Sequence, residues 1–302
     1  MGIAWPEPSP ADLAHCAASI RVHSKSFSAA ARLLPAHARA RAIATYAFCR
    51  AADDDVDGAS EEAAEVRHRR TRERLRRIYS GESLDTPAAR AFAWVVYSSR
   101  IPEDEPVALL DGMEQDLGVV RIERIEELLG YAYRAAGVVG RMMARIMGRT
   151  DPVSIRRATE LGMAMQLTNI SRDLREDAER NRIYLPGDWL LEEGGTFEHV
   201  FSKPFGPAVP KANARLLRLA DAYYEQGIAG ISRLPRACRP AILASALLYR
   251  EIGSEVARAG FASEERVAVP RARKMGILAR SVARGLLSTD LQLQPTDRRA
   301  FS

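Results

Sequence analysis

The amino-acid sequence predicts an all-α protein built as a single domain, and three observations lead to this prediction. Apolar residues recur three or four positions apart along nearly all of the 302 residues, which is the spacing of one helix face. Alternating strand-like runs bounded by Asn-Gly or Asp-Gly turns are absent. An apolar content of 47% is ample for a packed core, which we expect over about 15–288, followed by a tail at 289–302.

Each expected helix is a stretch in which the apolar spacing persists, and it ends where glycine, proline, serine and aspartate gather. The clearest breaks fall at 80–87, 148–152 and 185–189. A fourth break at 192–207 is longer, and we interpret it as a loop or a lid. The helices expected in this way cover residues 10–22, 38–56, 61–79, 87–99, 104–117, 124–148, 152–179, 207–232, 237–259 and 270–288.

Composition restricts the compartment and the partners. The net charge is +5, but the arginines are spread along the chain, so we expect no nucleic-acid partner. The three cysteines are too few and too scattered for a disulfide framework or a zinc site, which fits a reducing cytoplasm. The N-terminus lacks the basic and apolar regions of a signal peptide, and the longest apolar run, 240–249, is about half of a membrane-spanning helix.

An acidic cluster stands in the stretch YAFCRAADDDVDGAS, residues 46–60. Aspartate is a mediocre helix former and adjacent like charges repel, so the cluster lowers helix stability unless a cation neutralises it. On a helix of 3.6 residues per turn, Asp53 and Asp57 lie one above the other, about 6 Å apart along the axis. The same face extends back to Arg50 and Tyr46, which makes one polar stripe.

A second polar stripe occurs in LGMAMQLTNISRDLREDAERNRIYLP, residues 161–186. Apolar residues occupy most sides of this segment, so it should be buried. Because unpaired buried polar groups are costly, a polar face on such a helix must line something polar. The members of this face are Gln166, Asn169, Asp173 and Asp177.

Two Asp-x-x-x-Asp pairs that face each other would form a negative site rich in oxygen. Magnesium prefers such ligands and takes its remaining ones from water and substrate phosphates. The nearby Arg50, Arg172 and Arg182 suit a diphosphate, whose oxygens arginine grips in bidentate fashion. One such pair alone is most often a solvated helix face, but two matched pairs favour a metal and diphosphate site. Glu114 and Asp116 form a third acidic group, which we interpret mainly as structural.

Several stretches together resemble the squalene/phytoene synthase family, and within it the bacterial phytoene synthases. The resemblance runs in order from about residue 15 to about residue 285, and the two aspartate motifs in their full contexts are its most specific parts. It implies a single all-α isoprenoid-synthase domain around a deep central cavity. The stretches that carry it are HSKSFSAAARLLP (23–35), YAFCRAADDDVDGAS (46–60), YAYRAAGVVGRMMARIMG (131–148), MAMQLTNISRDLREDAERNRIYLP (163–186), ADAYYEQGIAGISRLP (220–235) and EERVAVPRARK (264–274).

The resemblance also implies roles for individual residues. The metal ligands would be the four motif aspartates together with Asn169, and Tyr46 and Arg50 would act beside the aspartates in catalysis. The expected cofactor is Mg²⁺, which Mn²⁺ could replace, and no NADPH is expected. The substrate would contact Ser24, Lys25, Ser26, Phe27, Ala31, Tyr131, Gly137, Gln166, Asn169, Arg172, Arg182, Tyr184, Tyr249 and Arg266.

Tail length is expected to depend on cavity volume near Ala31. Phe27 and Ala31 share a helix face, and the farnesyl-using carotenoid enzymes of the family can carry an aromatic residue at the Ala31 position. Alanine leaves room for a longer tail, which favours geranylgeranyl over farnesyl diphosphate.

The activity that the resemblance implies is that of a transferase. Two molecules of geranylgeranyl diphosphate would condense head to head, through prephytoene diphosphate, into phytoene, the first committed step of carotenoid biosynthesis. The nearest alternative keeps the fold and the metals but uses farnesyl diphosphate, as a dehydrosqualene or presqualene diphosphate synthase. The alternatives outside enzymes are a non-catalytic assembly partner, which would not need the costly acidic pairs, and a nucleic-acid binder, which the dispersed arginines disfavour.

Location and partners follow from the chemistry of this substrate and product. Geranylgeranyl diphosphate is amphiphilic and phytoene dissolves in membranes. We therefore expect a cytoplasmic protein in loose contact with the inner face of the membrane through an amphipathic face, near downstream carotenoid enzymes. The sequence does not show which face that is.

Overall fold

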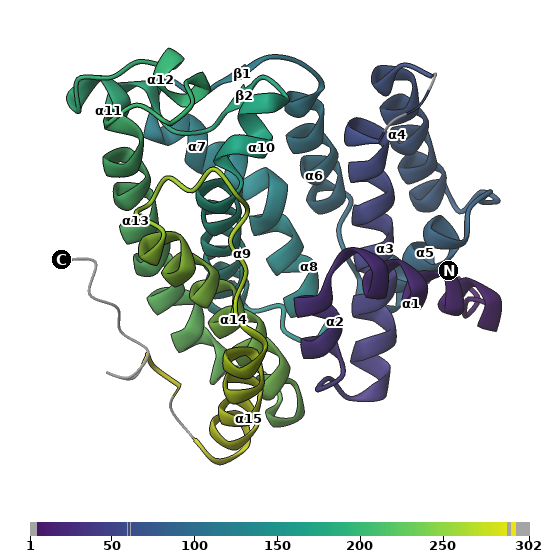
Figure 1. The fold of residues 1–302 in the computed structure, drawn as a ribbon. Coiled ribbons are helices and arrows are strands. Elements are labelled where there is room, and N and C mark those ends of the chain that lie inside the picture. The colour runs from purple at the N-terminus through teal and green to yellow at the C-terminus, as the bar shows by residue number, and fades with distance from the viewer. Residues whose placement is uncertain (1–4, 59, 61, 289–290, 294–302) are drawn as a thin grey trace.

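The computed structural model describes residues 5–58, 60, 62–288 and 291–293. Helices make up nearly all of the regular structure in these residues (Figure 1). The first helices are α1 (Pro10–His23), α2 (Lys25–Ala31), α3 (Ala36–Asp57), α4 (Ala64–Ser80), α5 (Pro87–Ser99) and α6 (Asp104–Glu114). They are followed by α7 (Ile125–Ala132), α8 (Val138–Ile146), α9 (Pro152–Arg172), α10 (Leu174–Glu179), α11 (Gly187–Glu192), α12 (Glu198–Phe201), α13 (Ala208–Ile231), α14 (Arg239–Arg258) and α15 (Arg271–Leu287).

Short elements join some of these helices. Turns of 3₁₀ helix lie at Gln115–Leu117 and Arg236–Cys238, and a π-helical turn at Tyr133–Gly137 connects α7 to α8. A parallel pair of two-residue strands, β1 (Val120–Arg121) and β2 (Arg182–Ile183), places Val120 opposite Arg182. This pair holds the segment after α6 beside the segment after α10.

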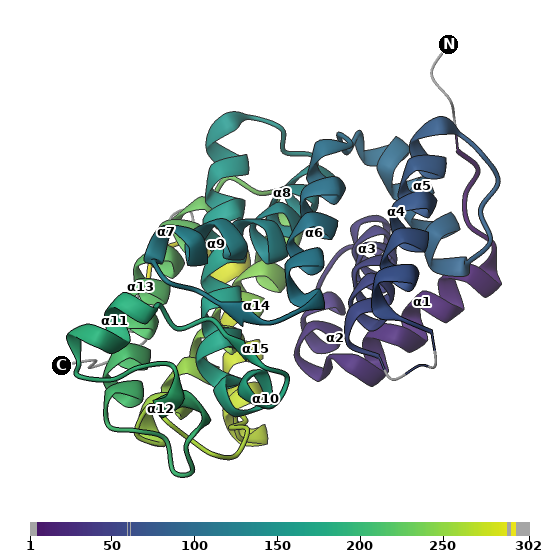
Figure 2. The same cartoon turned by 90° about the horizontal axis from the view of Figure 1, so that it is seen from above.

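Two groups of helices face each other across the middle of the molecule. In one group α9 is central and packs against α13, α8 and α14; in the other α3 packs against α1, α5 and α4 (Figures 1 and 2). Buried apolar residues from both groups form one hydrophobic cluster, in which Phe48 of α3 stacks on Phe92 of α5 with ring centroids 4.2 Å apart. The all-α prediction is confirmed.

Most of the expected helices are present within a few residues of their expected ends. The sequence did not lead us to expect α2, α11, α12 or the two strands. α2 is a short helix whose first turn is capped, because the Ser24 hydroxyl accepts a hydrogen bond from the Phe27 backbone amide at 3.2 Å. α11 begins within the expected break at 185–189, and α12 lies within the expected loop at 192–207.

The expectations of one helix over 124–148 and one over 152–179 are wrong. The first is interrupted by the π-helical turn, which adds one residue to the helical repeat while apolar spacing continues on both sides. The second breaks at Asp173, where φ is −100° and ψ is 18°. The Asp173 amide still donates to the Asn169 carbonyl at 2.9 Å, and the Asp173 carbonyl accepts from the Asp177 amide at 2.8 Å, so Asp173 keeps both of its backbone hydrogen bonds at the turn.

Glycines allow α9 to approach its neighbours closely. A Cβ on Gly140 of α8 would lie 2.1 Å from the Ala158 carbonyl oxygen, and one on Gly162 would lie 2.3 Å from the Ala136 carbonyl oxygen. No side chain fits at such distances. These contacts place backbone directly against backbone between α9 and the segment 136–140.

Two further expectations concern the membrane and the C-terminus. Within the part of the chain that the structure describes, no helix combines the length and the apolar character needed to cross a membrane. Most of the expected tail at 289–302 lies outside the described residues. Of the three that are described, 291–293, Leu291 and Leu293 are buried.

We expect Gly162→Ala to lower the free energy of unfolding by about 1–3 kcal/mol, because the new methyl group forces two backbones apart. Gly276→Ala on α15 is the matched control, since a Cβ there meets nothing within 4 Å. That control should be neutral or raise the unfolding free energy by up to about 1 kcal/mol. Urea unfolding of the two variants measures the difference, and equal effects would contradict the close helix contact.

Candidate active site

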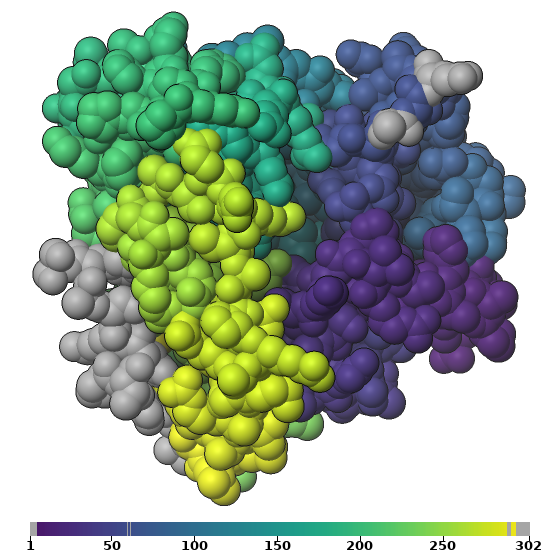
Figure 3. All heavy atoms as spheres, in the orientation of Figure 1, coloured from purple at the N-terminus to yellow at the C-terminus, as the bar shows by residue number. Residues whose placement is uncertain are grey.

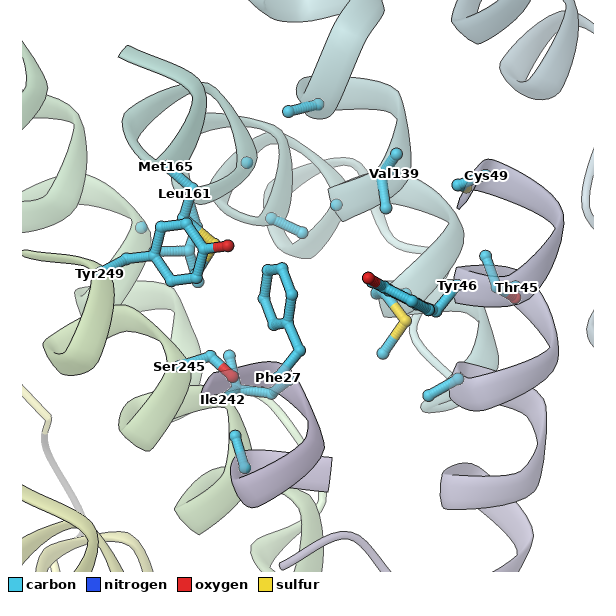
Figure 4. A pocket seen from close by; sticks show the side chains of 18 of the residues that line it. Phe27, Thr45, Tyr46, Cys49, Val139, Leu161, Met165, Ile242, Ser245 and Tyr249 are labelled. Atoms are coloured by element: carbon cyan, nitrogen blue, oxygen red, sulfur yellow. The ribbon is translucent and has the colours of Figure 1, made fainter. Parts of the chain in front are cut away.

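A cavity of about 410 Å³ lies between α3 on one side and α9 and α14 on the other. α2, α8 and α13 also contribute to its wall (Figure 4). One end, which we call the polar end, is lined by Tyr46, Arg50, Asp53, Gln166 and Asn169.

The other end of the cavity, which we call the apolar end, is mainly apolar, although Ser154 and Arg157 of α9 also line it. Along α9 the lining residues begin near the start of the helix, at Ser154, and finish at Asn169, so the two ends lie along the length of the helix. Methionines, alanines and glycines supply much of the wall between them. The residues of the apolar end are Leu34, Met147, Leu234 and Ala241.

The first polar stripe lies where the helical repeat places it. Ala47, Phe48 and Ala52 of α3 are buried in the core, whereas the stripe residues are only half-buried. The helix therefore turns its apolar sides to the protein interior and its polar side to the cavity. Arg50 donates a hydrogen bond to the Asp53 carboxylate at 2.8 Å and pairs with Asp54 as well.

The second stripe is divided between α9 and α10. Gln166 and Asn169 line the polar end, while Leu167 and Ile170 beside them are buried. Asp173 is the residue at which α9 ends, and Asp177 follows one turn later in α10. The two aspartates remain on successive turns, although they do not share a straight helix.

Ion pairs join the two acidic motifs. The Asp57 carboxylate of α3 lies 2.7 Å from the guanidinium of Arg180 and 2.7 Å from that of Arg182, both of which follow Asp177. Asp173 pairs with Arg172 and lies 3.1 Å from Arg266. Among the described residues, Asp177 is the one motif aspartate with no ion pair. Arginines therefore link the two motifs. Asp57 and Asp173 each have two arginine partners, whereas Asp177 has none among the described residues.

Asp116 is a further carboxylate at this site, although we interpreted it as mainly structural. The hydroxyl of Tyr131 donates to it at 2.9 Å and that of Tyr184 at 2.6 Å, and the two rings stack with centroids 4.7 Å apart. Arg182 donates to the Asp116 carbonyl at 2.6 Å. Glu114, the other residue of this acidic group, instead pairs with Arg72 on the surface at 2.6 Å.

The pKa values report this crowding of negative charge. Burial, and then repulsion from Asp173 and Asp116, raises the pKa of Asp177 to about 8. Burial likewise raises the pKa of Asp53 to about 6, with Asp57 and Asp116 adding to the rise and Arg50 opposing it. Carboxylates that resist ionisation because they are close together and poorly solvated gain most from a bound cation.

The residues present suit a hard divalent cation. The donors around the two motifs are carboxylate and amide oxygens, which Mg²⁺ prefers over nitrogen and sulfur. The Asn169 Oδ1 atom is buried and has no hydrogen-bond partner among the described residues, so it is available as a ligand. Across the same residues, no three His, Cys, Asp or Glu side chains converge closely enough to hold a metal by themselves.

Aromatic residues line the middle of the cavity. Phe27 of α2 points into it and stacks on Tyr249, with centroids 4.8 Å apart, and meets Tyr46 edge-on at 6.3 Å (Figure 4). Ala31 is buried and lines the wall one turn further along α2.

Other expected substrate contacts lie away from the cavity wall. Lys25 is exposed, and neither it nor Ser26 is among the lining residues. Gly137 is packed in a helix contact, where a Cβ would lie 3.1 Å from the Thr159 methyl group. Ser24 caps α2. Arg172, Arg182 and Arg266 belong to the ion-pair network that adjoins the polar end, and Tyr131 and Tyr184 belong to the Asp116 cluster.

Known proteins resemble this chain in sequence along most of its length. The family model described as squalene/phytoene synthase matches residues 20–273. The chain is 44% identical over 288 residues to a phytoene synthase of Cereibacter sphaeroides, covering 92% of this chain and 81% of that protein. It is 39% identical over 290 residues to a phytoene synthase of Rhodobacter capsulatus, covering 94% and 85%. The solved structure of a dehydrosqualene synthase in complex with ligand aligns with a TM-score of 0.82 at 28% identity, covering 90% of this chain and 96% of that one.

Replacing Asp177 by asparagine should stabilise the metal-free protein at pH 8. The folded-state pKa is about 8, above the ordinary value of 3.8, so ionising this carboxyl opposes folding increasingly as pH rises from about 4 to 8. We expect Asp177→Asn to raise the free energy of unfolding by on the order of 1 kcal/mol at pH 8 in EDTA, and the gain to vanish below about pH 4.

Asp85→Asn is the matched control for this measurement. Arg74 lowers the pKa of Asp85 through hydrogen bonds at 2.9–3.1 Å, so loss of that charge should reduce stability above about pH 4 or leave it unchanged. Urea unfolding across pH measures both variants. A loss of stability in Asp177→Asn at pH 8 would contradict the crowded, uncompensated site.

Proposed function

The chain belongs to the squalene/phytoene synthase family, and we propose that it is a phytoene synthase, which condenses two molecules of geranylgeranyl diphosphate into phytoene in the first committed step of carotenoid biosynthesis. The family is one of divalent-metal-dependent prenyl transferases. One observation carries the proposal: two acidic motifs, joined by ion pairs from Asp57 to Arg180 and Arg182, adjoin a cavity whose polar end is lined by Asp53 and Asn169 and whose remaining wall is mostly apolar. The whole helical chain acts as one catalytic domain, since helices from α2 to α14 contribute to the cavity.

The two parts of a prenyl diphosphate match the two ends of the cavity. The anionic diphosphate belongs at the polar end, where Arg50, Arg172 and Arg266 can turn from their carboxylate partners to phosphate oxygens. The hydrocarbon tail belongs between α2, α8 and α14, where burial of apolar surface favours it. A water-soluble substrate would gain nothing from that part of the wall.

Magnesium is the cofactor that we propose for this site, held by Asp53, Asp57, Asn169, Asp173 and Asp177. When bound, it neutralises charge on the departing diphosphate and so acts as a Lewis acid. The protein residues supply the rest of that stabilisation. Arginine guanidinium groups at the polar end compensate the leaving charge in a site of restricted water access.

The reaction requires two ionisations and one new carbon–carbon bond. Breaking the C1–O bond of the donor leaves an allylic cation, which the double bond of the acceptor attacks. The tertiary cation that results loses a proton from the donor C1 to a diphosphate oxygen as the three-membered ring closes, which gives the cyclopropyl intermediate prephytoene diphosphate. Loss of the second diphosphate and rearrangement join the two C1 carbons. A proton then passes to a diphosphate oxygen or a tyrosine, and the central double bond forms.

The cavity wall protects these cations. Water would quench each of them, and the apolar lining excludes it. Phe27, Tyr46 and Tyr249 present aromatic rings beside one another, and the negative faces of such rings attract positive charge. The aromatic group begins with Tyr46 at the polar end, and Phe27 and Tyr249 continue it along the cavity wall.

We place the enzyme in the cytoplasm, in contact with the inner face of the membrane and near the enzymes that use its product. The support for this placement is chemical. Phytoene is a hydrocarbon without polar groups, so it partitions into a bilayer rather than into water.

Incubation of the purified protein with geranylgeranyl diphosphate and Mg²⁺, without NADPH, should yield phytoene. EDTA should abolish the product, and Mn²⁺ should restore part of it. A parallel incubation with farnesyl diphosphate is the control, and chromatography with mass spectrometry identifies each hydrocarbon. Efficient production of dehydrosqualene or presqualene diphosphate, with no phytoene from the longer substrate, would replace this proposal by the farnesyl-using alternative.

Ala31→Phe should shorten the accepted tail. Ala31 is buried in the cavity wall, so a phenyl ring there occupies volume that the end of a long tail needs. We expect phytoene formation to fall at least about tenfold while condensation of farnesyl diphosphate is retained. Comparing kcat/KM for both substrates measures this selectivity, and a melting curve shows that the variant is folded. Unchanged phytoene output would refute the role of Ala31.

A further inference from the structure

We propose that the outer face of α15 docks on the surface of an anionic lipid bilayer, next to the apolar end of the cavity. The inference rests on the proposed function in one respect, because a hydrocarbon product needs a route to a membrane. We define the α15 outer face as the exposed residues Ala272, Met275, Gly276, Ala279, Ala283, Leu286 and Leu287.

α15 is attached to the molecule by one side only. It packs mainly on α14 and on the turn at Arg236–Cys238, and its buried residues Ile277, Ser281 and Gly285 form that inner side. Successive buried positions are four residues apart, as expected for one helix face. The outer face therefore points away from the protein, at the lower end of the molecule in Figure 3.

The outer face carries no charge. Met275 is 61% exposed, Leu286 49% and Leu287 82%, and they are among the most exposed large apolar side chains of the described residues. An isolated exposed leucine needs no explanation, but three large apolar residues aligned with alanines on one outward helix face indicate a covered surface.

Basic residues flank this face on both sides. The segment 271–288 contains Arg271, Arg273, Lys274, Arg280 and Arg284 and no acidic residue. Arg273 pairs with Glu251 at 2.9 Å, whereas Arg271, Lys274 and Arg280 have no ion pair within the described ranges. An apolar strip bordered by free cations is the pattern of a helix that lies in the headgroup region of an anionic membrane.

The position of α15 brings this surface near the apolar end of the cavity. The Gly285 backbone lies against the start of α14, where an added Cβ would be 2.6 Å from the Pro240 nitrogen. The next residues of α14, Ala241 and Ile242, line the cavity, and Ala241 belongs to its apolar end. A bilayer on the outer face would therefore lie next to the end of the cavity from which a hydrocarbon must leave.

Charge favours lipid over a second copy of the chain as the occupant. Two copies that met through this face would bring two sets of unpaired arginine and lysine side chains together. Anionic headgroups would instead neutralise them, while the apolar strip entered the boundary of the acyl chains.

Vesicle flotation tests the proposal without substrate. The full chain should float with vesicles of equal parts phosphatidylcholine and phosphatidylglycerol, bind pure phosphatidylcholine weakly, and be released by added NaCl. The double variant Leu286→Glu/Leu287→Glu should bind at least about tenfold less tightly. Arg271→Glu/Arg280→Glu should remove most of the preference for phosphatidylglycerol.

Leu191→Glu on α11 is the matched control, since Leu191 is 72% exposed at another end of the molecule. It should bind vesicles as the unmodified chain does. Loss of binding in this control, with retention in Leu286→Glu/Leu287→Glu, would overturn the assignment to α15. So would a change of oligomeric state in the double variant, seen by light scattering, with unaltered vesicle binding, because a second copy would then cover the face.

Flotation and phytoene formation distinguish failure of the docking proposal from failure of the proposed function. The double variant should convert geranylgeranyl diphosphate dispersed in detergent at the rate of the unmodified chain, since its changes lie outside the cavity. A chain that floats but makes no phytoene leaves the docking surface intact and rejects the function. A chain that makes phytoene but never floats rejects the docking surface.

Discussion

Like charges held together inside an apolar shell are the constraint on which this structure depends. The two aspartate motifs and Asp116 stand on segments whose other sides pack in the core, near enough for their charges to contribute to the raised pKa values of Asp53 and Asp177. Part of this negative charge is compensated at Asp57, which pairs with the two arginines that follow the other motif, Arg180 and Arg182. Asp177 has no such pair among the described residues, and burial, followed by repulsion from Asp173 and Asp116, raises its pKa to about 8. The remaining imbalance of charge makes this region receptive to cations.

The smallest elements of the fold organise this region. The β1 and β2 pair fixes the segment after Asp116 beside the segment that carries Arg182 and Tyr184. Tyr131 reaches the same carboxylate from α7, directly before the π-helical turn. Three segments far apart in sequence thus converge on Asp116. Two residues per strand contribute little to stability, but they set the register of the site.

Features of the site that depend on residues close together in the chain could be predicted from the sequence. The first polar stripe, and Gln166 and Asn169 of the second, lie on the helix faces that the helical repeat predicts. The break at Asp173 left no signal in the sequence, since the apolar spacing continues through it from Ile170 to Leu174. The position of Asp116 depends on contacts with residues 15 and 68 positions away, which no periodicity encodes. The exposed side of α15 was likewise not predictable, because it depends on which residues of α15 pack on α14.

The glycine contacts of α9 have a consequence for altering the product. At two positions on that side, Gly140 and Gly162, the cavity is bounded by main chain, since these residues already have the smallest possible side chains. Trimming residues there gains no volume, and enlarging them breaks the helix contact. On the α2 side, Phe27 and Ala31 present side chains that can be made larger or smaller within an existing helix. A protein engineer seeking carotenoid backbones of other lengths should therefore diversify α2 and leave Gly140 and Gly162 unchanged.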